Sequence, residues 1–146
     1  MMTDSQTLKT YTYTELSELP ALARELKTAL QHNLILFIGD LGAGKTTFIK
    51  ELVQQYGSTD LASSPSYALI NKYNADKTIY HIDLYRLDRL EDVFHLGIEE
   101  ILYGDNLCLI EWPQIIIDHI DPPYHILKIE VQESGERKIT FSEVSK

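Results

Sequence analysis

A run of glycines followed by a lysine and two threonines is the part of this sequence best suited to chemistry. Residues 39–46 read GDLGAGKT and match G-x-x-x-x-G-K-[ST] at every fixed position. The motif follows the apolar run LILFI and leads into TTFIKELVQQY, which has helical spacing. Glycines let successive backbone N–H groups face an anion, and the start of a helix adds the positive end of its dipole. The segment therefore predicts a binding site for nucleotide phosphates.

The side chains of this motif have separate expected roles. We expect Lys45 to reach the β- and γ-phosphates, and the Thr46 hydroxyl to be a ligand of Mg²⁺. Thr47 adds a hydroxyl near the α-phosphate. The backbone expected to surround the phosphates belongs to Gly39, Asp40, Leu41, Gly42, Ala43 and Gly44.

A second protein ligand for the metal should be a carboxylate at the end of a neighbouring strand. Glu111 ends the apolar run LCLI, as a Walker-B-type ligand requires, and Asp83 ends a second candidate strand. His81 lies two residues before Asp83 and shares its strand face, so it either pairs with that acid or is structural. Trp112 either packs in the core or covers the site. Arg86 is either a phosphate contact or the surface partner of an acid.

The sequence favours ATP over GTP. GTP-binding proteins read guanine with N-K-x-D, whereas the segment NKYN at residues 71–74 lacks the aspartate and comes too early in the chain. No D-x-x-G occurs between the glycine motif and this segment. A small-molecule kinase usually has an arginine-rich lid, but the four arginines here do not cluster in the sequence. They are Arg24, Arg86, Arg89 and Arg137.

Strand and helix patterns alternate along the chain. We expect strands at 8–13, 34–38, 66–73, 77–85, 107–112, 125–131 and 137–144, and helices between 19 and 31 and at 46–56, 89–96 and 98–102. Ser17 is expected to cap the first helix, and Asp88 with Glu91 to cap the helix at 89–96. Gly57 and Gly97 are expected to end the helices that precede them. The turns at 74–76 and 133–136 are too short for a crossover helix, so they predict antiparallel hairpins. The fold class is therefore α/β: a P-loop NTPase-like three-layer sandwich with a mixed, partly antiparallel central sheet.

Composition limits the classes of protein that fit. The chain has 146 residues, of which 44 % are hydrophobic, and this length favours one domain over residues 1–146. A net charge of −9 argues against a surface that holds nucleic acid directly. No apolar run approaches the ~18 residues needed to span a bilayer, and no export signal is visible, so we expect a cytoplasmic protein. Cys108 is the single cysteine and is expected to be a buried thiol.

Four segments together resemble one known family. GDLGAGKTT, SPSYALINKY, YHIDLYRL and LIEWP occur in this order and are similar to the TsaE (formerly YjeE) family of small bacterial P-loop ATPases. The resemblance covers roughly residues 10–130. Members of this family are required for making N6-threonylcarbamoyladenosine at position 37 of tRNAs that read codons starting with A. The glycine motif is shared with many families, whereas YHIDLYR and LIEWP are more specific.

The resemblance implies roles for particular residues. Ser66 replaces the threonine of an S-P-T segment whose hydroxyl faces the γ-phosphate side, and Ala68 lacks the hydroxyl that is usual there. Asp83 corresponds to an acid implicated in metal binding and hydrolysis, and Glu111 to a metal-coordinating glutamate. Trp112 corresponds to the tryptophan that accompanies it in the nucleotide site. The tail after residue 133 matches nothing diagnostic.

The resemblance also implies an activity and partners. TsaE-like proteins hydrolyse ATP weakly alone and faster when docked on the TsaB–TsaD heterodimer, whose turnover they support. The tRNA would then be held by the partners, which suits an acidic chain. We expect Thr46, Glu111 and Asp83 to hold Mg²⁺ while Lys45 offsets phosphate charge and water attacks in line. No residue stands out as a strong general base.

Two other functions remain open from the sequence. The first is a P-loop kinase that phosphorylates a small metabolite, which would transfer phosphate from ATP to an acceptor. The second is an assembly factor whose bound nucleotide is structural, which would show no hydrolysis stimulated by partners.

Overall fold

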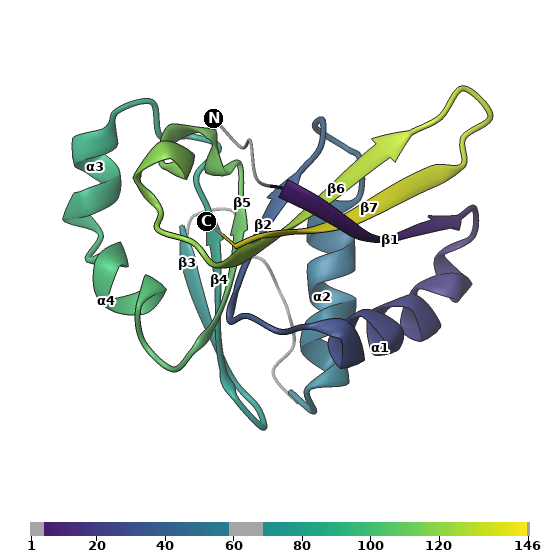
Figure 1. Ribbon diagram of the computed structural model, residues 1–146, viewed down its shortest axis with the longest axis horizontal. Coiled ribbons are helices and arrows are strands. Elements are labelled where there is room, and N and C mark those ends of the chain that lie inside the picture. The colour runs from purple at the N-terminus through teal and green to yellow at the C-terminus, as the bar shows by residue number, and fades with distance from the viewer. Residues whose placement is uncertain (1–4, 59–68, 146) are drawn as a thin grey trace.

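The computed structural model of the chain describes residues 5–58 and 69–145. In these residues a mixed sheet of seven strands has the order β1-β7-β6-β2-β5-β4-β3 (Figure 1). The strands are β1 (Ser5–Tyr13), β2 (Leu34–Ile38), β3 (Ile70–Asn74), β4 (Thr78–Asp83), β5 (Leu107–Glu111), β6 (Tyr124–Val131) and β7 (Arg137–Val144). The helices are α1 (Leu19–Ala29), α2 (Lys45–Gln55), α3 (Leu90–His95) and α4 (Ile98–Leu102). Short 3₁₀ helices occupy Leu16–Glu18, Pro113–Ile115 and Ile117–His119.

The sheet is the middle of three layers. Ile35 and Phe37 of β2 belong to the apolar cluster that contains α1 and α2. Leu34 and Leu36 belong to a second cluster, which contains residues of α3 and α4. Successive residues of a strand face opposite sides of a sheet, so β2 must be apolar throughout to contact both layers. The predicted three-layer α/β arrangement is confirmed.

Parallel and antiparallel pairing divide the sheet into two parts. β2 lies parallel to β5 and to β6, and β4 lies parallel to β5. β3 pairs antiparallel with β4, and β7 pairs antiparallel with both β6 and β1. Both predicted hairpins are confirmed. The first strand is longer than predicted, since β1 begins at Ser5. Of the strand predicted at 66–73, residues 66–68 lie outside the described part of the chain.

The predicted cap at the first helix is wrong. Ser17 lies inside the 3₁₀ helix that precedes α1, and its side chain does not cap a helix. Glu15 is the N-cap of that 3₁₀ helix, and the Glu18 carboxylate accepts the N–H groups of Thr14 and Glu15, both at 2.8 Å. These contacts satisfy backbone donors before the 3₁₀ helix, and not the donors at the start of α1 that Ser17 was expected to satisfy.

The predicted cap at α3 is also wrong. Arg89 occupies the N-cap position, and no side chain of the described residues caps the helix there. Glu91, expected to act with Asp88, instead pairs with Arg89 on the surface. The predicted helix ends are correct: Gly57 and Gly97 have φ values of 82° and 73°, the left-handed conformation that glycine adopts most readily.

Cys108 lies at the centre of the sheet, where β5 runs between β2 and β4. It pairs in register with Leu34 on one side and Tyr80 on the other. Its side chain is buried, as predicted, and burial raises the pKa of the thiol to about 12. The thiolate is therefore strongly disfavoured in the folded chain.

A buried histidine joins β6 to the segment before β2. His125 Nε2 accepts the backbone N–H groups of Gln31 and His32, at 3.0 and 3.2 Å, and Nδ1 lies 3.2 Å from the Ser142 carbonyl oxygen. Because Nε2 accepts and a carbonyl can only accept, the proton of the neutral ring belongs on Nδ1. A second proton would remove the acceptor for two backbone donors.

We predict that His125 makes the fold sensitive to acid. Burial lowers its pKa below the ordinary value of 6.5, and the facing His32 acts in the same direction, while the Ser142 carbonyl and Glu143 oppose them. The unfolded chain then binds this proton more readily than the folded chain, so stability is lost as the pH falls below about 6.5. Melting temperatures measured between about pH 5 and pH 8 should fall less steeply on acidification in His125→Gln, whose amide oxygen still accepts. His95→Gln, at an exposed position, is the matched control; equal slopes in all three proteins would contradict the prediction.

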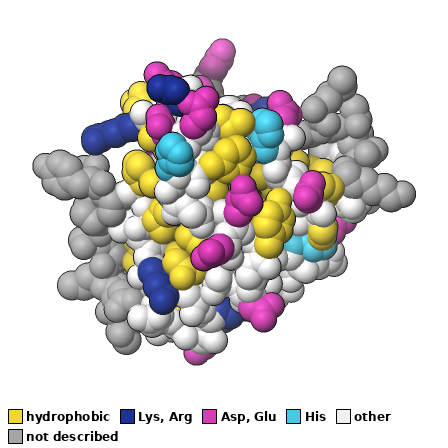
Figure 2. All heavy atoms as spheres, turned by 90° about the vertical axis from the view of Figure 1, so that its left-hand side faces the viewer, with side chains coloured by type: hydrophobic (Ala, Val, Ile, Leu, Met, Phe, Trp, Pro, Cys, Tyr) yellow, Lys and Arg dark blue, Asp and Glu magenta, His cyan; other side chains and the backbone are white. Residues whose placement is uncertain are grey.

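The surface around α3 and α4 mixes acidic and apolar side chains. Figure 2 shows this face with acidic groups spread among hydrophobic ones and few basic groups. Phe94 and Tyr103 are among the exposed aromatic residues of these helices and the turn that follows. Such a face is unsuited to the phosphate backbone of a nucleic acid. Among the described residues, the helices are too short or too polar to cross a membrane.

Candidate functional site

The glycine motif forms a loop between the end of β2 and the start of α2, as the sequence predicts. Gly42 and Gly44 have φ values of 82° and 108°, which side chains rarely allow. At Gly39 the limit is space, because a Cβ placed there would lie 2.8 Å from the carbonyl oxygen of Ile129 in β6. Gly42 and Gly44 are therefore required for their positive φ values and Gly39 for the lack of space, and together they let the loop turn back towards the sheet.

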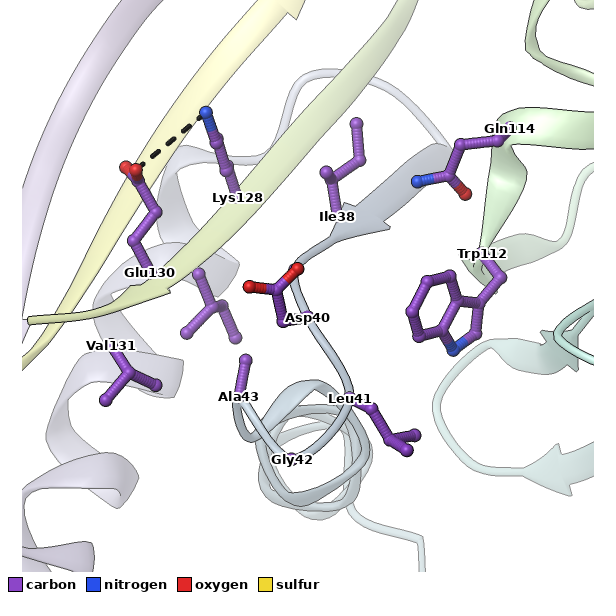
Figure 3. Close-up of a pocket in the computed structure, with 12 residues that line it drawn as sticks. Ile38, Asp40, Leu41, Gly42, Ala43, Trp112, Gln114, Lys128, Glu130 and Val131 are labelled. Carbon is purple, nitrogen blue, oxygen red and sulfur yellow. Dashed lines mark ion pairs between the residues drawn. The ribbon is translucent and has the colours of Figure 1, made fainter.

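Two pockets flank this loop. The larger, of about 510 Å³, lies between the loop, β6 and the chain after β5. Figure 3 shows Asp40 between the loop and β6, Trp112 and Gln114 on the opposite wall, and the Lys128–Glu130 ion pair of 3.9 Å along β6. The smaller pocket, of about 230 Å³, is lined by the start of α2 and by the ends of β4 and β5.

Lys45 is folded over the loop that precedes it. Only 4 % of the residue is exposed, and its Nζ donates to the carbonyl oxygen of Gly39 and lies 3.6 Å from the centroid of the Trp112 ring. Burial lowers the pKa of Lys45, while the nearby carboxylates of Glu111, Asp83 and Asp40 act in the opposite direction. A buried ammonium group with a lowered pKa is poorly compensated within the chain, so an anion in the pocket would stabilise it.

Glu111 is buried at the end of β5 and holds two neighbouring side chains. The Thr46 hydroxyl lies 2.9 Å from each of its carboxylate oxygens, and His81 Nε2 lies 2.6 Å from Oε2. Of the two alternatives for His81, the structure therefore shows a side-chain pair, but with Glu111 instead of Asp83. Asp83 is half-buried at the end of β4, opposite Glu111 in register, and lines the same small pocket.

The residues of the small pocket fit a divalent cation that is shared with a ligand. Within the described residues, no group of three or more His, Cys, Asp or Glu side chains is placed to hold a metal alone. Mg²⁺ prefers oxygen donors and usually keeps waters and phosphate oxygens among its ligands, so one or two carboxylates suffice. Thr46 and Glu111, with Asp83 nearby, supply oxygen donors of this kind.

Trp112 forms a cover between the two pockets. Its backbone has the left-handed φ of 56°, which turns the chain sharply after β5. The ring is half-buried, lines both pockets and packs against Tyr85, with a centroid distance of 4.8 Å. Of the two alternatives from the sequence, this position favours a cover over the site instead of packing in the core.

Other site residues expected from the sequence have less contact with this arrangement. Thr47 and Leu41 are both exposed. Thr47 lines the small pocket only, and Leu41 lines both pockets. Arg86 is exposed, and its role stays a prediction with two alternatives. Ser66 lies outside the described residues.

Sequence reasoning missed one residue that reaches the loop. Arg137 Nε, at the start of β7, donates to the carbonyl oxygen of Ala43 at 2.9 Å. The two residues are 94 positions apart. The hairpin prediction placed Arg137 at a strand start, but no spacing in the sequence indicates that this strand end lies beside the glycine loop.

Comparison with known proteins gives a consistent match over most of the chain. Residues 13–139 match the family model described as threonylcarbamoyl adenosine biosynthesis protein TsaE. The chain is 42 % identical over 123 residues to the tRNA threonylcarbamoyladenosine biosynthesis protein TsaE of Rickettsia conorii, covering 82 % of this chain and 70 % of the relative. It is 41 % identical over 110 residues to the protein of the same name from Bacillus subtilis, covering 73 % of this chain and 66 % of the relative.

A solved structure has the same architecture. The crystal structure of YdiB from Bacillus subtilis superposes with a TM-score of 0.79 at 29 % sequence identity. The match covers 97 % of this chain and 88 % of the other. The antiparallel strand β7 is thus part of the shared fold, although the sequence showed no diagnostic motif after residue 133.

Proposed function

The chain belongs to the TsaE family, and on that premise we propose that it is a Mg²⁺-dependent ATP hydrolase in the biosynthesis of tRNA N6-threonylcarbamoyladenosine. The observation that carries the proposal is the convergence of Lys45, Thr46, Asp83 and Glu111 on one small pocket. These residues come from the start of α2 and the ends of two neighbouring parallel strands. Such a crevice at the carboxyl ends of parallel strands is where α/β proteins bind ligands.

Each residue of the pocket has a part in this chemistry. Loop amides and the Lys45 ammonium group would bind the phosphates, and Thr46 and Glu111, with Asp83, would hold Mg²⁺. The bound metal would neutralise charge on the β- and γ-phosphate oxygens. His81 keeps the Glu111 carboxylate directed at Thr46. Trp112 and Tyr85 form an apolar wall that limits the access of bulk water.

The site supports slow hydrolysis by the chain alone. Glu111 already accepts contacts from Thr46 and His81, which leaves Asp83 as the less committed carboxylate of the pocket. Asp83 Oδ1 accepts the backbone N–H of Tyr85 at 3.0 Å, so it too is partly held. We propose that docking on the TsaB–TsaD heterodimer, in the cytoplasm, completes the site. The acidic chain would then meet tRNA only through these partners.

The test is phosphate release from ATP by the purified chain, with and without its TsaB and TsaD partners. We expect slow release alone, faster release with both partners, and loss of release when Mg²⁺ is chelated. Stoichiometric transfer of the γ-phosphate to a metabolite would instead support a kinase. Tight ATP binding without stimulation by the partners would support an assembly factor, and either result would overturn the proposal.

A further inference from the structure

Three strand ends of the antiparallel part of the sheet meet beside the glycine loop. Arg137 is the first residue of β7, and in register it lies opposite Tyr13 at the end of β1. On its other side it lies opposite Val131, the last residue of β6. The hairpin between β6 and β7, seen in Figure 1, therefore places a guanidinium group at the loop.

Arg137 contacts the loop without lining either of the two pockets. Its Nε donates to the carbonyl oxygen of Ala43 at 2.9 Å, and the residue is half-buried. Among the described residues that line the two pockets, Arg137 is not present, whereas Ala43 lines one pocket and Gly44 the other. The guanidinium group is thus placed to act on the loop backbone and not directly on a ligand.

A hydrogen bond to the Ala43 carbonyl determines where the next amide points. The peptide between Ala43 and Gly44 is trans, so its C=O and N–H point in opposite directions. With the oxygen held by Arg137, the Gly44 N–H is directed away from Arg137, and Gly44 is a residue that lines the small pocket. Glycine permits many backbone conformations, so without this contact the peptide could rotate and turn its oxygen towards the phosphates.

The packing around Gly44 also places the ends of β1 and β7 against the loop. A Cβ built on Gly44 would lie 3.1 Å from the Tyr13 hydroxyl oxygen and 3.5 Å from Arg137 Nε. The two strand ends therefore pack directly against this glycine. The contact from Arg137 is charge-assisted, which makes it stronger than a hydrogen bond between neutral groups.

We propose that Arg137 is a positioning residue, which orients the Ala43–Gly44 peptide so that the Gly44 N–H faces the phosphates of the bound nucleotide. This inference rests on the proposed function of the loop as an ATP site. It gives the antiparallel strands a part in ligand binding, because they carry the group that holds the loop in its binding conformation.

The test measures ligand affinity in Arg137→Gln and in a matched control, Lys138→Gln. Lys138 is the exposed neighbour on the same strand, so both variants lose one positive charge. Trp112 is the single tryptophan and lines both pockets, so its fluorescence reports binding of ATP and of inorganic tripolyphosphate. We expect both ligands to bind about tenfold more weakly to Arg137→Gln, and within about twofold of normal to Lys138→Gln.

A second measurement separates positioning from a merely structural role. The Gly44 amide resonance should shift on addition of tripolyphosphate in the normal chain and much less in Arg137→Gln, at a temperature well below both melting transitions. If Arg137→Gln does not fold, Arg137→Lys serves instead: it keeps the charge but not the planar donor group, and we expect about threefold weaker binding.

The outcomes distinguish this inference from the proposed function. Failure of the normal chain to bind ATP would refute both. Normal ATP binding with unchanged affinity and an unchanged Gly44 shift in the Arg137 variants would refute the positioning role alone. A lower melting temperature with unchanged affinity would also refute it, because Arg137 would then stabilise the fold without orienting the loop.

Discussion

Replacing Lys45 by alanine is expected to weaken ATP binding about a hundredfold and to remove measurable hydrolysis. The ammonium group is the only lysine or arginine nitrogen among the described residues lining the small pocket. Loss of a hydrogen bond to a charged group costs about 1.5–3 kcal/mol, and about 2.8 kcal/mol corresponds to a hundredfold change in affinity. Titration of Trp112 fluorescence with ATP, followed by a phosphate-release assay, measures both effects.

The loss should be specific to the site and not result from unfolding. Burial lowers the pKa of Lys45, so the folded chain disfavours its charge, and we expect the melting temperature without ligand to change little. Lys50, on the same helix and half-buried, is the matched control, and Lys50→Ala should bind ATP normally. Equal ATP affinity and turnover in Lys45→Ala and the normal chain would show that the loop is not a phosphate site.

Replacing Glu111 by glutamine is expected to reduce hydrolysis about a hundredfold or more while ATP binding persists. The substitution keeps the shape and an acceptor for Thr46 but removes the negative charge that would hold Mg²⁺. Loss of groups that only orient metal ligands already costs about 10–100-fold, so a ligand should cost at least as much. Glutamine is preferable to alanine, because alanine would leave the buried His81 without its partner. The measurement is phosphate release as a function of Mg²⁺ concentration.

A second histidine–glutamate pair in the same chain provides the control. His32 Nε2 lies 2.5 Å from Glu143 Oε2 near the other end of β6 and β7. Glu143→Gln therefore removes the same charge from the same kind of pair, and its hydrolysis should keep the normal Mg²⁺ dependence. A Glu111→Gln chain with the Mg²⁺ dependence of the normal protein would rule out a metal-ligand role for Glu111.

Local patterns predicted most of the fold correctly. β2 and α4 have the predicted bounds, because a fully apolar strand and a segment that follows a helix-ending glycine have strong local signals. Predicted caps at Ser17 and Asp88 failed, because Ser17 lies inside an additional 3₁₀ helix and Glu91 pairs with Arg89. Local sequence does not show which of these short-range contacts forms.

The candidate site likewise contains residues that the sequence predicted and contacts that it did not. The loop and the carboxylate after β5 have local signals, since glycine spacing and an acid after an apolar run are visible in the chain. The partner of His81 depends on which strand lies beside β4, and the contact of Arg137 depends on the register of β7 with β1. Such contacts arise from pairing between distant segments, so spacing alone does not reveal them.

The buried thiol of Cys108 can be used to measure local opening of the native protein. A thiol reagent in solution can modify this side chain only after the layer that covers it moves away, because the thiol lies in the apolar cluster with residues of α3 and α4 and resists ionisation. The alkylation rate of the native protein therefore measures how often this layer separates from the sheet. Since Glu111 lies three residues further along the same strand, the rate reports on opening beside the element that carries the proposed metal-binding carboxylate.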